Sequence, residues 1–323
     1  MSVIARPRVL FLLGAIAASA ACSGGDDGPA GGLDAAPQPD AAPDARPQGM
    51  VMLGSRGTCP REIKADGDTL YWLEEDTLVR SSATTFSPEV IYSGVNGGDL
   101  QVAGGAAYWL GTWPVRLDLE ERVARPMVTT DVTGLTVVDG ERPIVIADFK
   151  RIAEIEAGGV LRDLHTETTS TLTDLERSGT WLFWTRRPDS GGGAYLHWRD
   201  AVSGFYGGGL LVDNRVAFAS GEHLALIVRL VEGRYSLGAV RGGVLSEVQF
   251  LSFTPKRLTV GADSSVYALG AENDRLVHAA SSGGVYRFDA TSTDLRFDEL
   301  VAVGEGAVVV DCNGPATYYR WYP

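Results

Sequence analysis

Few side chains in this sequence have the types and spacing that chemistry at a site requires. Three neighbouring carboxylates, Glu74, Glu75 and Asp76, follow Trp72 in an expected turn, where carboxylates can exchange protons with a ligand or bind it. A charged, solvated turn explains the same three residues without any ligand. Both interpretations stay open at the level of the sequence.

Aromatic side chains are the more suggestive feature. Trp72, Trp109 and Trp184 recur at one position of an internal repeat, and we expect them in the core. Trp113 and Trp198 do not follow that repeat. An exposed indole on a loop above a channel suits stacking on a sugar or a peptide, although packing inside the protein is the commoner use. We therefore treat Trp113 and Trp198, with the three carboxylates, as candidate binding residues.

Metal, nucleotide and hydrolase chemistry lack their usual signals. No two of the four histidines are spaced as a helical or hairpin metal pair. They are His165, His197, His223 and His278. Neither the Gly-x-Ser-x-Gly turn of serine hydrolases nor the Gly-x-x-x-x-Gly-Lys loop that binds phosphates occurs. We expect no metal and no cofactor, with calcium on the oxygen ligands of Asp66-Gly67-Asp68 or Asp263-Ser264-Ser265 as the alternative, and we assign no catalytic residue.

Charge excludes one class of partner. The chain has 323 residues, a 45% hydrophobic composition that can build a core, and a formal net charge of −13. No basic stripe is present to neutralise phosphates, so nucleic acid is not an expected partner. We expect a monomer.

An internal repeat predicts the architecture. From residue 50 onward, short runs of β-branched and aromatic residues alternate with Gly, Asp, Asn or Ser. The first copy, 63–72, matches 100–109 with the same internal spacing, and seven copies follow one another in steps of 36 to 42 residues. About four strands per step is the pattern of a β-propeller blade. We predict an all-β, seven-bladed β-propeller over residues 50–323.

Two glycine triplets flank the strand expected at 194–199. They lie at 191–193 and 207–209. We predict that both are long turns, with a ligand loop as the alternative.

The N-terminus predicts export. Arg6 and Arg8 precede an apolar run at 9–18 that is too short to cross a bilayer, as in a signal peptide. The sequence Ser-Ala-Ala-Cys at 19–22 resembles a bacterial lipobox, which implies cleavage after residue 21 and a lipid on Cys22. Serine stands where that pattern usually has leucine, so ordinary signal-peptide cleavage stays as the alternative.

The segment after Cys22 predicts a tether. Residues 22–49 consist mainly of Ala, Pro, Gly and Asp, with Leu33 as the only large apolar side chain, so they cannot bury enough surface to fold. Ser23 resembles the residue found after the cysteine in lipoproteins sent to the outer membrane. We expect a lipid-anchored, flexible linker in the cell envelope, facing the periplasm or the exterior.

The two ends of the propeller are expected to pair. The last copy leaves room for three strands, and residues 50–53 precede the first copy without a partner. An N-terminal strand that completes the last blade would close the ring and hide two sheet edges. Cys59 and Cys312 then fall in connections on one face, which favours a disulfide in an oxidising compartment. Two buried free thiols are the alternative.

Strand endings carry a resemblance to a known family. The sequences Leu-Tyr-Trp at 70–72, Ala-Tyr-Trp at 107–109 and Leu-Phe-Trp at 182–184 resemble the second strand of blades in YWTD-like and related bacterial periplasmic propellers. The resemblance covers about residues 50–323 at the level of the repeat. Leu110 follows the second tryptophan where an acidic residue belongs. The resemblance therefore implies the fold and carries no function.

These observations lead to three functional hypotheses. The first is a noncatalytic binding or scaffolding module at the cell envelope, anchored in the membrane by its lipid, with a protein, peptide or glycan as ligand. The second is an extracellular enzyme of glycosidase or lyase type, because propellers can place carboxylates around a channel mouth. The third is an accessory lipoprotein of outer-membrane protein assembly, which would expose strand edges or an apolar patch.

Overall fold

The computed structural model describes residues 49–323 except for 139, 212–214, 221–224, 232–233, 242–243, 262, 272–274, 283–284 and 293–294. The expected signal peptide, the lipidation site Cys22 and almost all of the linker lie outside the described residues. Every regular element within the described residues is a β-strand. In this part of the chain no helix is long and apolar enough to span a membrane.

Along the described chain the strands form seven four-stranded antiparallel sheets. The first three contain, in order, β2 (Glu62–Asp66), β3 (Thr69–Glu74), β4 (Thr77–Ser82) and β5 (Glu89–Ser93); β6 (Gly98–Ala103), β7 (Ala106–Leu110), β8 (Pro114–Asp118) and β9 (Ala124–Pro126); β10 (Val132–Val138), β11 (Arg142–Ala147), β12 (Arg151–Ile155) and β13 (Leu161–Thr166).

The remaining sheets continue the pattern, and the last takes one strand from the N-terminus. They contain β14 (Ser170–Ser178), β15 (Trp181–Pro188), β16 (Tyr195–Asp200) and β17 (Tyr206–Leu211); β18 (Arg215–Ser220), β19 (Ala225–Val231), β20 (Arg234–Arg241) and β21 (Val244–Leu251); β22 (Pro255–Val260), β23 (Val266–Gly270), β24 (Arg275–Ser282) and β25 (Val285–Ser292); β26 (Glu299–Val303), β27 (Gly306–Asp311), β28 (Ala316–Tyr322) and β1 (Gly49–Arg56).

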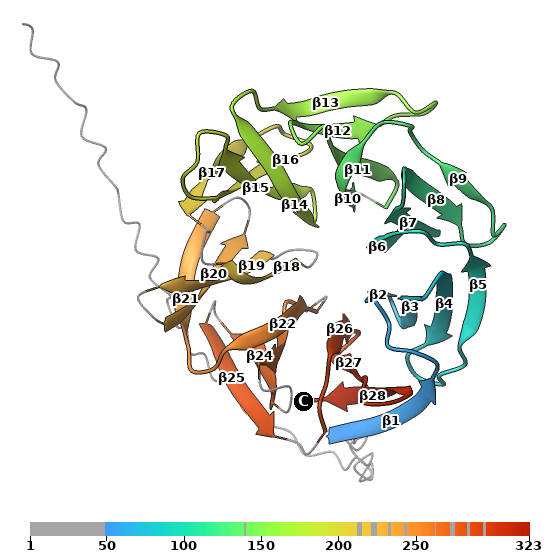
Figure 1. Ribbon diagram of the computed structural model, residues 1–323. Coiled ribbons are helices and arrows are strands. Elements are labelled where there is room, and N and C mark those ends of the chain that lie inside the picture. The colour runs from blue at the N-terminus through green and yellow to red at the C-terminus, as the bar shows by residue number, and fades with distance from the viewer. Residues whose placement is uncertain are drawn as a thin grey trace, which may run out of the picture. The chain divides into compact units, whose positions relative to one another are not determined.

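The sheets are arranged as a closed ring, which is a β-propeller (Figure 1). The first strands of the sheets line the centre, and each contacts the next in the order β2, β6, β10, β14, β18, β22, β26 and again β2. Within each sheet the following strands lie progressively further out. The predicted all-β propeller is therefore confirmed.

Buried side chains between neighbouring sheets hold the ring together. One hydrophobic cluster joins the last sheet to the first, and another joins the first sheet to the second. Trp72, Trp109 and Trp184 are each no more than 1% exposed, as expected for core residues at one repeat position. Each sheet buries both faces against its neighbours, and this explains the nearly continuous apolar runs of the second strands.

The chain closes the ring with its own two ends. β1 pairs antiparallel with β28, from Gly49 opposite Tyr322 to Arg56 opposite Ala316. The pairing of the N-terminal strand with the last sheet is thus confirmed. The Cys59–Cys312 disulfide beside this junction has a Cα–Cα distance of 5.2 Å and spans 253 residues of sequence. It covalently links the start of the ring to its end.

The disulfide predicts a large effect on stability. In a Cys22→Ala background, replacing Cys59 and Cys312 by Ser should lower the free energy of unfolding by about 4 to 5 kcal/mol, because a long loop is released in the unfolded chain. Urea denaturation of both proteins measures the difference. A reductant should destabilise the parent to the same extent and leave the double variant unchanged; equal urea midpoints in all four measurements would contradict the prediction.

Candidate functional site

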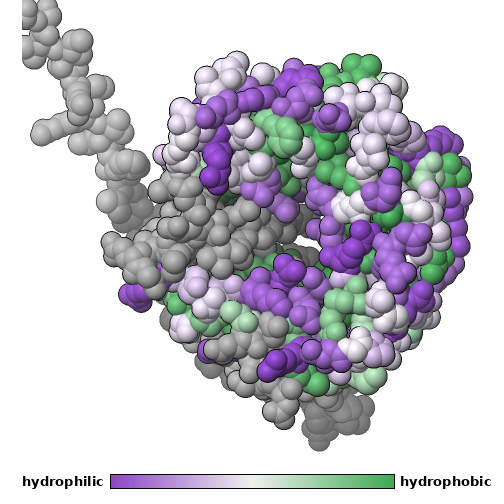
Figure 2. All heavy atoms as spheres, viewed as in Figure 1, coloured by the Kyte–Doolittle hydropathy of each residue, from purple (hydrophilic) through white to green (hydrophobic). Residues whose placement is uncertain are grey.

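Strand direction places several of the predicted site residues on one face of the ring. In each antiparallel sheet, the connection between the second and third strands lies at the same end as the connection to the next sheet. We call this the Cys59 face, defined by Cys59, the turn 74–76, Trp113 and Cys312. In the view of Figure 2, hydrophilic side chains gather around the central opening wherever described residues surround it.

The predicted carboxylate turn divides into two parts. Glu74 is engaged inside the protein, since its carboxylate accepts hydrogen bonds from Arg56 Nε at 2.9 Å and from the backbone N–H of Thr58 at 3.2 Å. These contacts hold the connection that carries Cys59. Glu75 and Asp76 are exposed. Only these two carboxylates of the predicted three are therefore presented to solvent.

The two predicted tryptophans have different environments. Trp113 lies in the β7–β8 connection on the Cys59 face and is 42% exposed, so its ring is available to a ligand. Trp198 lies within β16 and is only 7% exposed. A Cβ at Gly207 of the neighbouring strand would come within 2.4 Å of the Trp198 indole nitrogen. For Trp198 the structure therefore shows the packing alternative and not an exposed stacking ring, because its indole packs over this glycine.

The same contact corrects the interpretation of one glycine triplet. Residues 207–209 lie inside strand β17 and form no turn. A Cβ at Gly208 would lie 2.5 Å from Nδ1 of His197, so this strand lacks side chains where rings of β16 cover it. The triplet 191–193 does lie in the connection between β15 and β16, as predicted.

Carboxylates at the start of the inner strands connect neighbouring sheets. The Glu62 carboxylate accepts hydrogen bonds from the backbone N–H groups of Asp99 at 2.6 Å and of Leu100 at 2.5 Å. Asp99 in turn accepts a hydrogen bond from the N–H of Leu135 in the next sheet at 2.9 Å. Gly98 permits the close approach, since a Cβ there would lie 2.7 Å from a Glu62 oxygen. These carboxylates therefore link neighbouring sheets of the ring.

Ion pairs repeat this arrangement between the sixth and seventh sheets. Lys256 Nζ lies 3.2 Å from Asp298, and Arg257 Nη2 lies 2.9 Å from Glu299. Asp298 also accepts a hydrogen bond from the N–H of Cys312 at 3.2 Å, which connects the pair to the disulfide. Burial raises the pKa of Glu299, and the nearby Arg257 opposes that shift.

These inner-strand residues are absent from the sites predicted from the sequence, although the sequence carries a signal for them. Glu62 and Asp99 are separated by the same 37 residues as Trp72 and Trp109. Acidic residues that recur at the repeat length, just before an apolar inner strand, indicate contacts between equivalent positions of neighbouring blades.

A second polar cluster lies between the third and fourth sheets. His165 Nε2, from β13, is 3.0 Å from Glu167 Oε1, and Arg186 Nε, from β15, is 3.2 Å from Glu167 Oε2. Arg186 also donates a hydrogen bond to the hydroxyl of Ser170 at 2.9 Å. Three titratable side chains are thus brought together at this junction, from β13, from the connection that follows it and from β15.

Tyr206 and His197 extend this cluster onto β17 and β16. Tyr206 Oη lies 2.5 Å from Nδ1 of His197, and the His165 ring stacks on Tyr206 with centroids 5.5 Å apart. Burial raises the pKa of Tyr206 and lowers the pKa of His197. Both shifts favour the neutral forms, so the pair has little tendency to separate charge. His278 lies apart, against Tyr267, and His223 is outside the described residues.

Metal sites give no comparable cluster. Across the described part of the chain, no group of three or more His, Cys, Asp or Glu side chains is arranged to hold a metal ion.

Comparisons with known proteins identify the fold and leave the family open. No family model matches the chain, and no curated protein matches it. A catalytically inactive virginiamycin B lyase from Staphylococcus aureus, solved with quinupristin, has a TM-score of 0.60 at 11% identity, covering 84% of this chain and 99% of that chain.

Two other solved structures show the same likeness. Oligogalacturonate lyase from Vibrio parahaemolyticus has a TM-score of 0.59 at 11% identity, covering 84% of this chain and 91% of that chain. The β-propeller domain of Swd1 from Myceliophteria thermophila has a TM-score of 0.64 at 12% identity, covering 84% and 100%. At these identities the likeness shows a β-propeller and no shared function.

The raised pKa of Asp99 predicts how the free energy of unfolding changes with pH. Burial raises the pKa of Asp99 from 3.8 to about 6, so the folded protein holds this proton more tightly than the unfolded chain. Ionisation of Asp99 therefore costs stability as the pH rises from about 4 to above 6, by at most about 3 kcal/mol. Asp99→Asn keeps an acceptor for the Leu135 N–H, and asparagine tolerates the φ of +58°.

We expect Asp99→Asn to match the parent protein near pH 4 and to exceed its free energy of unfolding at pH 7.5. Urea denaturation between pH 4 and pH 8 measures the difference. Asp189→Asn is the control with the opposite sign, because a hydrogen bond from Lys150 lowers the pKa of Asp189. If the free energies of unfolding of Asp99→Asn and the parent differ by the same amount at every pH, the raised pKa of Asp99 is wrong.

Proposed function

We propose that this chain is a noncatalytic β-propeller that binds a protein, peptide or glycan on its Cys59 face. The observation that carries the proposal is the engagement of the carboxylates there. Glu62 and Asp99 accept backbone hydrogen bonds from the neighbouring sheet, while Glu74 and Glu299 pair with arginines. A general acid and base need freedom to exchange protons with a substrate, and these contacts restrain it.

The groups left at the surface suit recognition. Trp113 presents an indole face, and Glu75 and Asp76 present carboxylates on the same side of the ring. An indole stacks on the apolar face of a sugar or on a peptide side chain, and carboxylates accept hydrogen bonds from hydroxyl or ammonium groups. A rigid, disulfide-closed ring holds such groups without reorganisation, which lowers the entropic cost of binding.

The proposal places this module in the cell envelope. The apolar run at 9–18 and the residues leading to Cys22 support export and lipid attachment, and the linker at 22–49 supports a tether. A disulfide in the folded part is consistent with an oxidising compartment. Outer-membrane attachment follows from the resemblance of Ser23 to its counterpart in lipoproteins sorted there.

An enzyme is the second candidate, and one observation favours it. The cluster of His165, Glu167, Arg186, His197 and Tyr206 gathers acid and base groups at one junction. The neutral His197–Tyr206 pair could transfer a proton to or from a ligand that reached it. His197 is only 7% exposed, however, and of this pair only Tyr206, which is 44% exposed, is open to a ligand. This is why binding at the Cys59 face is the leading proposal.

Ligand arrays test the binding function directly. The Cys22→Ala chain should bind a defined class of glycan or peptide, and Trp113→Ala should weaken that binding about tenfold or more because it removes the aromatic contact. Phe205→Ala is the matched control, since this ring is 60% exposed in the β16–β17 connection at the opposite face. Measurable turnover of a bound ligand, abolished by His197→Gln, would favour the enzyme instead.

Membrane fractionation tests the tether. In the native host, the parent chain should sediment with membranes and Cys22→Ala should move to the soluble exported fraction, because the lipid supplies the attachment. Cys59→Ser controls for loss of an unrelated cysteine and should stay with the membranes. If Cys22→Ala still sediments with membranes, lipid attachment at this residue is wrong.

A further inference from the structure

Two arginines face each other across neighbouring strands on the outer side of the second sheet. Arg116 in β8 is the direct cross-strand partner of Arg125 in β9. Like charges in directly opposite positions repel each other and destabilise a strand pair. The chain as a whole carries a net charge of −13, so a local pair of cations needs a specific explanation.

Equivalent positions in the adjacent sheets have opposite charges. In the first sheet, Arg80 in β4 is paired with Glu89 in β5, with the charged atoms 2.9 Å apart. In the third sheet, Glu154 in β12 is paired with Arg162 in β13 and contacts it. Arg116 aligns with Arg80, since they are the partners of Tyr108 and Tyr71 on the second strands. Only the second of these three sheets lacks the carboxylate.

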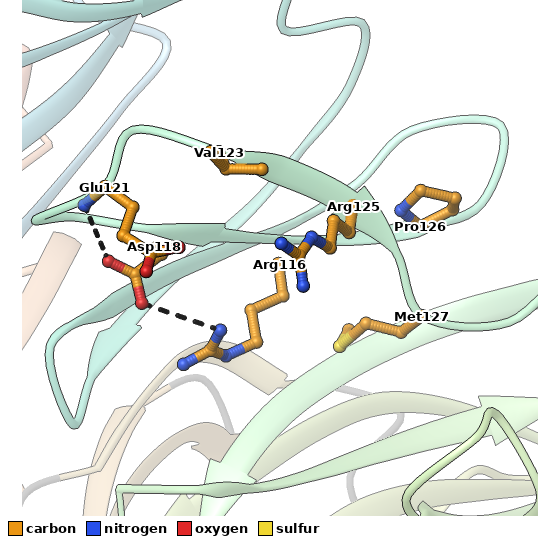
Figure 3. A pocket seen from close by; sticks show the side chains of 7 residues that line it. All are labelled: Arg116, Asp118, Glu121, Val123, Arg125, Pro126 and Met127. Atoms are coloured by element: carbon orange, nitrogen blue, oxygen red, sulfur yellow. Dashed lines mark hydrogen bonds and ion pairs between the residues drawn. The ribbon is translucent and has the colours of Figure 1, made fainter.

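The arginine pair borders a cavity. A pocket of about 230 Å³ is lined by seven residues: Arg116, Asp118, Glu121, Val123, Arg125, Pro126 and Met127. Figure 3 shows the two arginine side chains beside each other, with Pro126 and Met127 on one side and Asp118 and Glu121 on the other. The pocket thus combines two guanidinium groups, two carboxylates and an apolar wall.

The carboxylate nearest to the pair does not neutralise both cations. Asp118 lies 3.9 Å from Arg116 Nη1, beyond a hydrogen bond. Its Oδ1 accepts the backbone N–H groups of Glu120 at 3.0 Å and Glu121 at 2.9 Å. Asp118 is therefore held by its own turn. The N–H of Glu121 and, to a lesser degree, the charges of Arg116 and Arg125 lower the pKa of the Asp118 carboxyl, so one carboxylate is shared by two cations.

We propose that this pocket binds a small ligand through an oxyanion, either a carboxylate or a phosphate group, held between Arg116 and Arg125. A guanidinium fork matches the geometry of both anions and binds them through two parallel N–H donors. The bound anion occupies the role that the carboxylates of Glu89 and Glu154 have in the adjacent sheets. The volume suits a ligand of about the size of one sugar ring, with its apolar face against Met127. The site is separate from the Cys59 face and does not depend on the function proposed there.

Calorimetry on the full Cys22→Ala chain tests the site with three probes: sodium glucuronate, inorganic phosphate and glucose. Saturable binding of either anion at low ionic strength, with none for glucose, is the expected result, and comparison of the two anions identifies the preferred group. Arg116→Gln and Arg125→Gln should each weaken binding about tenfold or more. Arg80→Gln is the matched control, because it removes an arginine at the same position of the adjacent sheet, and it should leave affinity unchanged.

Thermal melting of the ligand-free proteins gives an independent readout. Arg125→Glu restores the opposite-charge pair of the adjacent sheets, so it should melt at a higher temperature than the parent and lose anion binding. Arg80→Gln should melt at a lower temperature, because it breaks such a pair. Absence of saturable binding for both anions, or equal binding by the parent and Arg125→Glu, would overturn the proposal.

Discussion

Closure of the ring is the constraint on which the rest of this structure depends. Each four-stranded sheet buries its faces against two neighbours, so no sheet can complete its core until the last one meets the first. The hydrophobic cluster between these two sheets includes Trp72 from the first and Tyr318 from the last. The pairing of β1 with β28 and the Cys59–Cys312 disulfide both lie at this junction. Contacts that are distant in sequence thus decide whether the short, local sheets form one stable body.

Polar contacts between neighbouring sheets follow the same repeat as the hydrophobic ones. Glu62 reaches the N–H of Asp99 over 37 residues, and Arg257 reaches Glu299 over 42 residues, because each contact joins equivalent positions of adjacent sheets. Buried polar groups need such partners, and here one acidic side chain satisfies the next sheet's backbone. This arrangement places carboxylates at the start of the inner strands and also engages them in contacts with the next sheet.

Side chains that could give this propeller a specific function therefore lie outside the contacts that repeat from sheet to sheet. The connection that carries Trp113 and the opposed Arg116 and Arg125 both depart from what neighbouring sheets have at the equivalent positions. Lyases and the Swd1 propeller share the fold with this chain at 11 to 12% identity, so the fold does not identify the function. Departures from the repeat are accordingly the most informative positions for function.

The sequence by itself determined the all-β class, the repeat, the burial of Trp72, Trp109 and Trp184, and the pairing of the two chain ends. Each of these follows from local patterns that recur about every 40 residues, and from counting strands at the ends. Only the tertiary structure decided that Trp198 is buried over Gly207, that Glu74 is held by Arg56, and that Arg116 faces Arg125 beside a cavity. These outcomes depend on strand register and on side chains from separate segments, and a one-residue shift in register would exchange the partners.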